Sequence, residues 1–365
     1  MISILQQDCS HIALSMKIIQ ISPYFPPHVG GVEYHVKELA DGLVRRGHQV
    51  IVASSCGSWN GEMIHIPSID LFYSPMPVKI PILEADVCHS HIPSPLFAFM
   101  LRHAKPHVVT YHNDVTIPEN VNGHAMPRKF GAALEKINAK MVRPVLEGAD
   151  AIIATTKSYA ETSPFLQDHM DRVRVVPNAI NVSLYPPVKE KENYVLYAGR
   201  MVSYKGVLSL LIAMQQVQRT ADLDLVLVGD GYDRRWLEQI AARLNVRAKF
   251  TGRLERSMFI DTISRAEMLV LPTQNRLEAF GIVLLEAMAC ETPVLAFDTP
   301  GVNEVASKGG CIYSSEVELA ELILSLHENR HRREMLGENG RDAVLENYSW
   351  EKALDLMQAV YREVS

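Results

Sequence analysis

The chain has 365 residues, of which 47% are hydrophobic and 21% are charged, and its formal net charge is −6. This composition is typical of an ordinary soluble globular protein, and the acidic balance argues against a general nucleic-acid-binding surface. A chain of this length exceeds a single ordinary core, so two domains are expected.

The cysteine pattern and the N-terminal residues predict the cellular compartment of the protein. The five cysteines are scattered and form no C-x-x-C pair, so neither a disulfide framework nor a zinc site is expected, and a reducing, cytoplasmic location is predicted. No apolar run reaches the 18 residues of a membrane span. Residues 1–15 lack the basic start and apolar core of a signal peptide. They are predicted to be a disordered extension, or the product of a start codon assigned too early, with Met16 as the true beginning.

Short β-branched runs alternate with helical patterns in the first half of the chain. Strands are predicted over residues 16–22, 49–54, 85–91, 107–112 and 149–155. Apolar residues recur at helical spacing in 31–47, directly after the first strand, and again in the basic segment 128–144. Both segments are therefore predicted to be helices.

The same alternation restarts in the second half. Strands are predicted over residues 194–199, 223–229, 246–252, 267–272 and 293–297. Alternating strands and helices predict an α/β fold with two doubly wound, Rossmann-like domains, each a parallel sheet covered on both faces. The predicted domains are 16–185 and 190–349, joined near the paired prolines of 181–193, with 350–365 as a closing helix. Because ligands bind at the carboxyl ends of such strands, the site is expected in the cleft between the domains.

Three loops after predicted strands carry glycines or cations. Gly30 and Gly31 directly precede the first helix, where bare backbone amides can approach a phosphate or a sugar. The loop "AGRMVSYKG" (198–206) places Arg200 and Lys205 beside a helix start, which suits a diphosphate. In "VGDGYDRRWLE" (228–238), a pair of glycines, Gly229 and Gly231, would let a ligand approach. Each loop alone also fits a plain turn or a solvated surface, and the G-x-G-x-x-G dinucleotide pattern is absent.

Two carboxylates stand eight positions apart in the apolar stretch "RLEAFGIVLLEAMAC" (276–290). A helix is predicted to start near Phe280, which puts Glu278 in the preceding loop and Glu286 about two turns into the helix. The free amides of Phe280 and Gly281 would then face a polar ligand, and a nucleotide sugar fits this arrangement. The alternative is that Glu278 is a first-turn charge and Glu286 a partly buried, paired structural acid.

Taken in order, "PPHVGG", "AGRMVSYKG", "VGDGYDRRWLE", "FTGRLERSM" and "EAFGIVLLE" resemble the retaining glycosyltransferases of family 4, which have the GT-B fold. The resemblance covers nearly all of residues 16–360. It implies that the first half binds the acceptor and the second half binds a nucleotide-diphosphate sugar. It also implies that the closing segment 348–364 crosses back to the first domain.

The resemblance assigns roles to individual residues. Arg200 and Lys205 would hold the diphosphate, Glu286 the ribose and Glu278 the donor hexose. Ala279 stands where many relatives have Ser or another small residue. The full predicted donor-binding set is Gly30, Gly31, Gly229, Gly231, Arg253, Leu254, Ala279, Phe280, Gly281, Ile282 and Glu286, with the backbone at Arg253 and Leu254 holding the base.

Twelve of the 14 histidines precede residue 170, and three of them (His89, His91 and His112) are predicted to lie at strand ends. His112 in "TYHNDV" stands where the family's active-site histidine usually stands, so it is predicted to contact the donor hexose. His91 is expected to shape its loop. No spacing typical of a metal site is present.

The mechanism implied by the resemblance is retaining, front-face hexosyl transfer without a metal or a cofactor; UDP- or GDP-hexose is the co-substrate and a hydroxyl group the acceptor. Cations and the helix start would stabilise the leaving diphosphate, and Glu278 would orient the donor rather than attack it. Two alternatives stay open: a nucleotide-sugar epimerase of the same fold, and a non-catalytic sugar-nucleotide-binding protein.

The basic helix predicted over 128–144 carries five cations and one acid, which suits the surface of an anionic bilayer. A lipid-linked acceptor at the inner face of the membrane is therefore predicted. The alternative is that the helix buries its apolar stripe on the first sheet and leaves its cations in water. The cations are Arg128, Lys129, Lys136, Lys140 and Arg143, and the stripe is Phe130, Ala133, Leu134, Ile137 and Met141.

Overall fold

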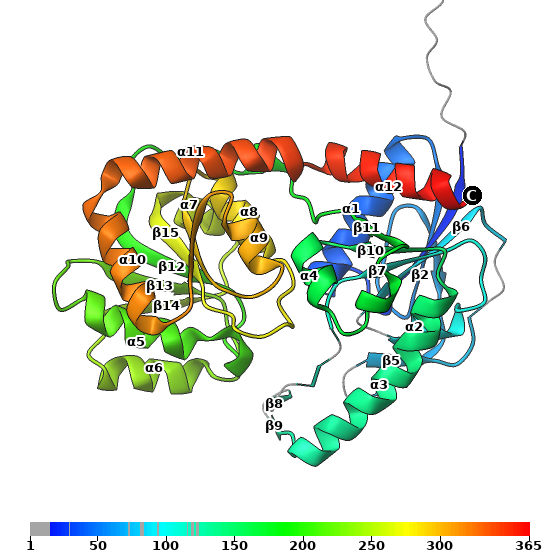
Figure 1. Cartoon of the computed structure of the whole chain (residues 1–365), viewed down its shortest axis with the longest axis horizontal. Helices are drawn as coiled ribbons and strands as arrows, with labels where there is room; N and C mark the ends of the chain where they lie inside the picture. The colour runs from blue at the N-terminus through cyan, green and yellow to red at the C-terminus, as the bar shows by residue number, and fades with distance from the viewer. Residues whose placement is uncertain are drawn as a thin grey trace, which may run out of the picture.

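The computed structural model describes residues 15–28, 30–71, 74–80, 84–92, 95–114, 116–117, 120–121 and 124–365. The extension predicted for residues 1–15 lies almost wholly outside this part of the chain. Two α/β domains stand side by side, each built on its own parallel sheet (Figure 1). The predicted fold class is confirmed.

The first domain has a seven-stranded sheet in the order β11-β10-β7-β6-β1-β2-β3, and every neighbouring pair is parallel. The strands are β1 (Lys17–Ile21), β2 (Gln49–Ser54), β3 (Glu62–His65), β6 (Val87–Ile92), β7 (His107–Tyr111), β10 (Ala151–Ala154) and β11 (Val173–Val175). The helices are α1 (Gly31–Arg45), α2 (Pro95–Met100), α3 (Arg128–Gly148) and α4 (Lys157–Thr162). Two small antiparallel pairs are β4 (Ser68–Leu71) with β5 (Ser74–Pro77), and β8 (Asn120–Val121) with β9 (His124–Ala125).

The second domain has a six-stranded parallel sheet in the order β14-β13-β12-β15-β16-β17. The strands are β12 (Glu192–Ala198), β13 (Asp224–Val228), β14 (Ala248–Gly252), β15 (Ala266–Leu271), β16 (Val294–Phe297) and β17 (Gly310–Tyr313). The helices are α5 (Val207–Val217), α6 (Arg234–Arg243), α7 (Arg256–Arg265), α8 (Ile282–Ala289), α9 (Val302–Ala306), α10 (Glu316–Glu328) and α11 (Arg330–Asn347).

The last helix, α12 (Trp350–Val364), lies on the first domain, and α11 leads into it along one side of the molecule (Figure 1). Its buried face includes Leu354 and Met357, which share a hydrophobic cluster with Val36 and Leu39 of α1. Gly42 of α1 leaves room for this contact, since a Cβ atom there would come within 2.8 Å of Leu354 Cδ2. The C-terminal helix is therefore part of the hydrophobic core of the first domain.

All ten predicted strands are present within a few residues, and the three other strands of the two large sheets are β3, β11 and β17. Each of these three is an edge strand of three or four residues. Strands this short at a sheet edge give too few buried positions for an apolar run; the fourth edge strand, β14, has five residues and was predicted. In the described residues, no helix is both long enough and apolar enough to cross a bilayer.

Candidate active site

The helix that carries Glu286 begins later than predicted. Gly281 has a φ of 77°, a left-handed conformation outside the helical range, and α8 starts after it at Ile282. A side chain at Gly281 would also come within 2.6 Å of Leu271 Cδ2. The prediction of a start near Phe280 is therefore wrong by two residues, and Glu286 lies about one turn into the helix instead of two.

Lys205 and Glu278, which the sequence assigns to the donor, form an ion pair with each other. Their side chains are only 16% and 17% exposed. The loop of Lys205 packs on the end of β15, because Gly206 at a φ of 71° lies against the carbonyl of Pro272, where a side chain would collide. This packing brings two residues 73 positions apart in the sequence to one place.

Arg200 is not part of that pair. Its guanidinium donates a hydrogen bond of 2.6 Å to the hydroxyl of Tyr204, and its Cζ lies 6.0 Å from the centre of the Tyr204 ring. The ammonium of Lys205 lies 5.7 Å from the same ring. The two cations predicted to hold the diphosphate therefore flank one tyrosine that sequence reasoning did not single out.

Glu286 is a buried, paired acid. The Tyr185 hydroxyl and the Arg256 guanidinium, 3.2 Å away, both bond to its Oε1 atom, so Oε2 takes part in neither contact. Burial raises the pKa of Glu286, and the hydrogen bond from Tyr185 and the charge of Arg256 oppose that rise. These contacts match the alternative stated for Glu286, a structural acid, while leaving one oxygen for a ligand.

Several predicted donor-binding residues are explained by packing. Gly229, at a φ of 124°, and Gly231 lie against the carbonyls of Gly199 and Met201, where any side chain would collide. Their lack of side chains therefore serves the contact between two loops, and ligand approach is not needed to account for it.

The residues after Glu278 are likewise enclosed. Ala279 is buried in a cluster with Tyr111 and Tyr159 of the first domain, and Phe280 is buried in the core of the second. Their side chains are therefore part of the hydrophobic cores. Further along the domain, Arg253 is exposed between β14 and α7, and Leu254 is half-buried.

The starts of α1 and α8 face each other across the domain boundary. Gly30 is the N-cap residue of α1 in an extended conformation, and the position of a Cβ on Gly31 lies 3.7 Å from Cδ1 of Ile282, the first residue of α8. Two helix N-termini with unpaired amides thus lie close together, which is a favourable place for a negatively charged group.

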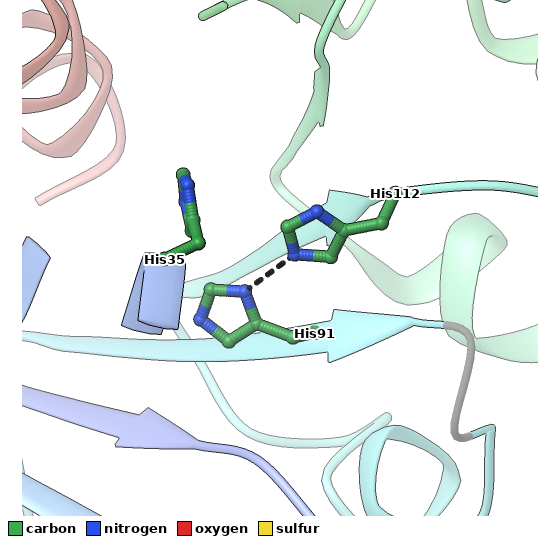
Figure 2. Close-up of side chains that lie close together, drawn as sticks. All are labelled: His35, His91 and His112. Carbon is green, nitrogen blue, oxygen red and sulfur yellow. Dashed lines mark hydrogen bonds between the residues drawn. The ribbon is translucent and has the colours of Figure 1, made fainter. Parts of the chain in front are cut away.

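His112 directly follows β7 and is 9% exposed. Its Nε2 lies 3.2 Å from Nδ1 of His91, and its ring lies 5.1 Å, centre to centre, from that of His35 on α1 (Figure 2). The expected position near a strand end is correct for His91, the last residue but one of β6, and wrong for His89, which lies in the middle of the strand. Both are buried inside β6, where alternate residues share a face of the strand, and His91 contacts His112 directly.

Two family models cover most of the chain. The one described as "Glycosyltransferase Family 4" matches residues 29–184, and the one described as "Glycosyl transferases group 1" matches residues 186–343. The chain belongs to glycosyltransferase family 4. Its two domains are those of a GT-B glycosyltransferase.

Relatives and solved structures agree with this assignment. An uncharacterized glycosyltransferase from Methanocaldococcus jannaschii is 27% identical over 96% of this chain and 99% of its own length. A GDP-mannose-dependent monoacylated alpha-(1-6)-phosphatidylinositol monomannoside mannosyltransferase from Corynebacterium glutamicum is 36% identical over 42% of each chain. The Anabaena protein HepE, solved in complex with UDP and glucose, superposes with a TM-score of 0.73 at 17% identity, over 95% of this chain and all of its own.

In this glycosyltransferase, hydrogen bonds tie the loop of Glu278 to the first domain. The side chain of Asn113 donates to the carbonyl of Leu277 at 3.1 Å. Asn113 directly follows His112 in the chain, and Leu277 directly precedes Glu278. The hydroxyl of Tyr159 donates to the carbonyl of Arg276 at 2.9 Å. The backbone at the two residues predicted to bind the hexose, His112 and Glu278, is thus brought to the same stretch of the domain boundary.

An ion pair between Arg276 and Asp114 also crosses this boundary. Nε of Arg276 lies 2.6 Å from Oδ2 of Asp114, whose side chain is 3% exposed. Oδ1 of Asp114 accepts hydrogen bonds from Tyr111 and Ser163 at 3.0 and 2.6 Å. The guanidinium also lies 4.4 Å from the centre of the Tyr159 ring.

Sequence reasoning missed this group. One signal was present, because Asp114 stands two residues beyond a predicted active-site histidine and Arg276 two residues before a predicted active-site glutamate. Nothing in the sequence pairs them.

Proposed function

We propose that this glycosyltransferase moves a hexose from a nucleotide-diphosphate hexose to a hydroxyl group of a membrane-presented acceptor, with retention of configuration and without a metal ion. The observation that carries the proposal is the bond between Asn113 and Leu277. It puts the residues predicted to act on the donor hexose, His112 and Glu278, on the two sides of one domain boundary.

The donor is assigned to the second domain. Lys205 and Arg200 are cations suited to the diphosphate, and the α8 N-terminus adds partial positive charge beside them. Glu278 holds Lys205 in place before the donor binds, and the diphosphate then takes over the cation. A solved neighbour binds UDP and a relative uses GDP-mannose, as their names state, so both nucleotides enter the test.

The chemistry follows from these charges. Departure of the nucleoside diphosphate leaves an oxocarbenium-like centre, and the two cations stabilise the charge that develops on the leaving phosphate. A leaving phosphate oxygen then takes the proton of the attacking hydroxyl on the same face. Glu278 acts by orienting the hexose: once the diphosphate has taken over Lys205, its carboxylate can accept hydrogen bonds from hexose hydroxyls, and same-face transfer needs no enzyme nucleophile.

His112 acts in this scheme as a neutral hydrogen-bonding group. Burial, with smaller effects of His35 and His91, keeps its pKa well below the usual range. A neutral imidazole can bond to a hexose hydroxyl without adding a positive charge next to the oxocarbenium-like centre.

The acceptor side is inferred from α3. The first half of this helix extends beyond the body of the first domain (Figure 1), and the apolar side chains of Phe130 and Ile137 are 54% and 53% exposed. The alternative that the whole apolar stripe is buried on the sheet is therefore wrong for these residues. Exposed apolar groups among cations suit an anionic lipid surface, where each Lys or Arg contributes about 1 kcal/mol. One relative is named for a lipid-linked acceptor, a monoacylated phosphatidylinositol mannoside.

The test of activity has two stages. A thermal-shift panel of UDP- and GDP-hexoses selects the donor, because a ligand that binds only the folded state raises the unfolding temperature. Turnover of that donor is then measured with and without a panel of soluble and lipid-linked acceptors, and NMR of the product gives the anomeric configuration. A product formed from the nucleotide sugar alone would show an epimerase, and an inverted linkage would overturn the retaining mechanism.

Membrane binding is tested by co-sedimentation with anionic vesicles. The wild type is expected to bind in a salt-sensitive way, and reversing three charges of α3 should weaken binding without changing nucleotide binding. The variant is Lys129→Glu, Lys136→Glu, Lys140→Glu. The control makes the same change of charge on exposed lysines elsewhere: Lys249→Glu, Lys308→Glu, Lys352→Glu. A wild type that ignores anionic vesicles at low ionic strength would rule out the membrane-presented acceptor.

A further inference from the structure

Three buried histidines from three separate elements meet beside the domain boundary. His35 comes from α1, His91 from β6 and His112 from the end of β7 (Figure 2). One ring nitrogen of each lies within 4.8 Å of those of the other two. Nδ1 of His91 and Nε2 of His112 are 3.2 Å apart, close to the distance of about 3.3 Å between two imidazole nitrogens on a tetrahedral zinc ion.

The hydrogen bonding of this cluster is incomplete. Both ring nitrogens of His35 and Nε2 of His91 are buried without a hydrogen bond of normal length and angle. His89, in the same strand as His91, is different, because its two nitrogens bond to Tyr361 and Thr110 at 2.7 Å each. A buried polar group without a partner costs free energy, and an ion bound between the three rings would give one nitrogen of His35 a partner.

The protonation state of the cluster suits a cation. Burial lowers the pKa of all three rings, to about 4 for His35, whose pKa a hydrogen bond with the Asn178 side chain shifts in the opposite direction. Nδ1 of His91 and Nε2 of His112 share a hydrogen bond, so binding an ion there replaces that bond and moves its proton to the other nitrogen of the same ring. A ring of neutral imidazoles without carboxylate or thiolate favours the borderline ions Zn²⁺, Ni²⁺ and Cu²⁺ over Mg²⁺ or Ca²⁺.

We infer that His35, His91 and His112 form a binding site for a single zinc ion, with the fourth position open to water or to an exogenous ligand. The inference stands on the convergence of one ring nitrogen from each of three elements, and on His35, whose ring nitrogens are buried without a hydrogen bond of normal geometry. His112 is the most exposed of the three and follows the strand at the domain boundary, so the ion enters from that side.

Zinc bound at this site is expected to inhibit the transfer reaction. A zinc ion on His112 occupies the lone pair and places two positive charges where the donor hexose is expected to develop its own. This consequence rests on the proposed function, whereas the binding of zinc does not. The ion is not a catalytic requirement, so removing it should leave turnover unchanged or raise it.

The experiment measures metal binding on chelator-treated, full-length protein. Isothermal titration with Zn²⁺ is expected to give one site per chain, and Co²⁺ should give the visible absorption of a tetrahedral ion. His35→Gln and His91→Gln should each weaken zinc binding by at least about 10-fold. The matched control is His103→Gln, which removes an exposed histidine from the same domain.

The variants are checked for folding by circular dichroism, and X-ray absorption of the zinc-loaded wild type counts its imidazole ligands without any mutation. Fewer than three imidazoles on the ion, or equal zinc affinity in the wild type and His35→Gln, would overturn the site. If zinc binds as expected and transfer activity is not inhibited, the zinc site stands and the assignment of His112 to the donor fails.

Discussion

Arg276→Ala should separate assembly of the active site from donor binding. Arg276 is in the second domain, and it contacts the first through Asp114, through the hydroxyl of Thr162 at 3.0 Å and through the ring of Tyr159. The loop that it anchors carries Glu278. Without Arg276, the loop of Glu278 should bind the first domain more weakly. Turnover should then fall while the nucleotide still binds.

The magnitude follows from burial. Removing one partner of a buried ion pair costs about 3–5 kcal/mol, because the other charge is left without compensation. Arg276 is 27% exposed, and Asp114 keeps its bonds from Tyr111 and Ser163, so about 2 kcal/mol is the better value. These contacts cross the domain boundary, so the lost free energy destabilises the arrangement in which the two domains are packed together. It corresponds to a decrease in kcat/KM of about 30-fold.

The assay is steady-state kinetics with the preferred donor and acceptor, together with calorimetric titration of the nucleoside diphosphate. Affinity for the diphosphate should change by less than about 3-fold, since the contacts of Arg200 and Glu286 are not altered. The control is Arg265→Ala, which removes an arginine whose ion pairs with Asp261 and Glu192 are at the surface of the same domain. Arg276→Ala with the kinetics of Arg265→Ala would refute the reasoning, as would a loss of turnover fully explained by lost diphosphate affinity.

The other predictions concern the donor, the metal, the membrane and acid stability. Arg200→Ala and Lys205→Ala should each weaken nucleoside diphosphate binding in calorimetry, and unchanged affinity at low salt for both would contradict their assignment. Transfer should survive excess chelator, whereas a complete loss restored by Mg²⁺ or Mn²⁺ would show a metal-dependent reaction. Phe130→Ser with Ile137→Ser should reduce vesicle co-sedimentation while leaving the unfolding temperature nearly unchanged, because both side chains are already exposed; a large drop in that temperature would show that they are packed. Burial lowers the pKa of His107 to about 4 from 6.5, so its stabilising contribution is present above pH 6.5 and is lost as pH falls through 4. Denaturant titrations at pH 7 and pH 5 should therefore show about 2 kcal/mol less pH dependence for His107→Gln than for the wild type, and equal dependence would contradict the linkage.

The sequence by itself determined the fold class and the central strands. Runs such as "VIVA" and "LVLV" are apolar on both faces, and only a strand between two layers of helices buries both faces. The alternation with helices then leaves few topologies, because parallel strands need crossover connections. Strands β3, β11 and β17 escaped prediction because each is an edge strand of only three or four residues, too short for a clear apolar run, whereas the five-residue edge strand β14 was predicted.

The sequence also singled out the loops predicted to form the site, because glycines, cations and acids at strand ends are local features. It did not determine the contacts between them. Whether Lys205 meets a phosphate or Glu278, and whether Glu286 is free or held by Tyr185 and Arg256, depends on how loops far apart in the chain pack together.

The relation between the two domains was decided only by the tertiary structure. Asp114 and Arg276 are 162 positions apart, and His35 is 77 positions from His112. Hydrophobic periodicity reports which face of an element is buried and carries no information about its partner. The pairing of charges across the domain boundary and the meeting of three histidines follow from the docking of complete elements, so no pattern within a single segment contains them.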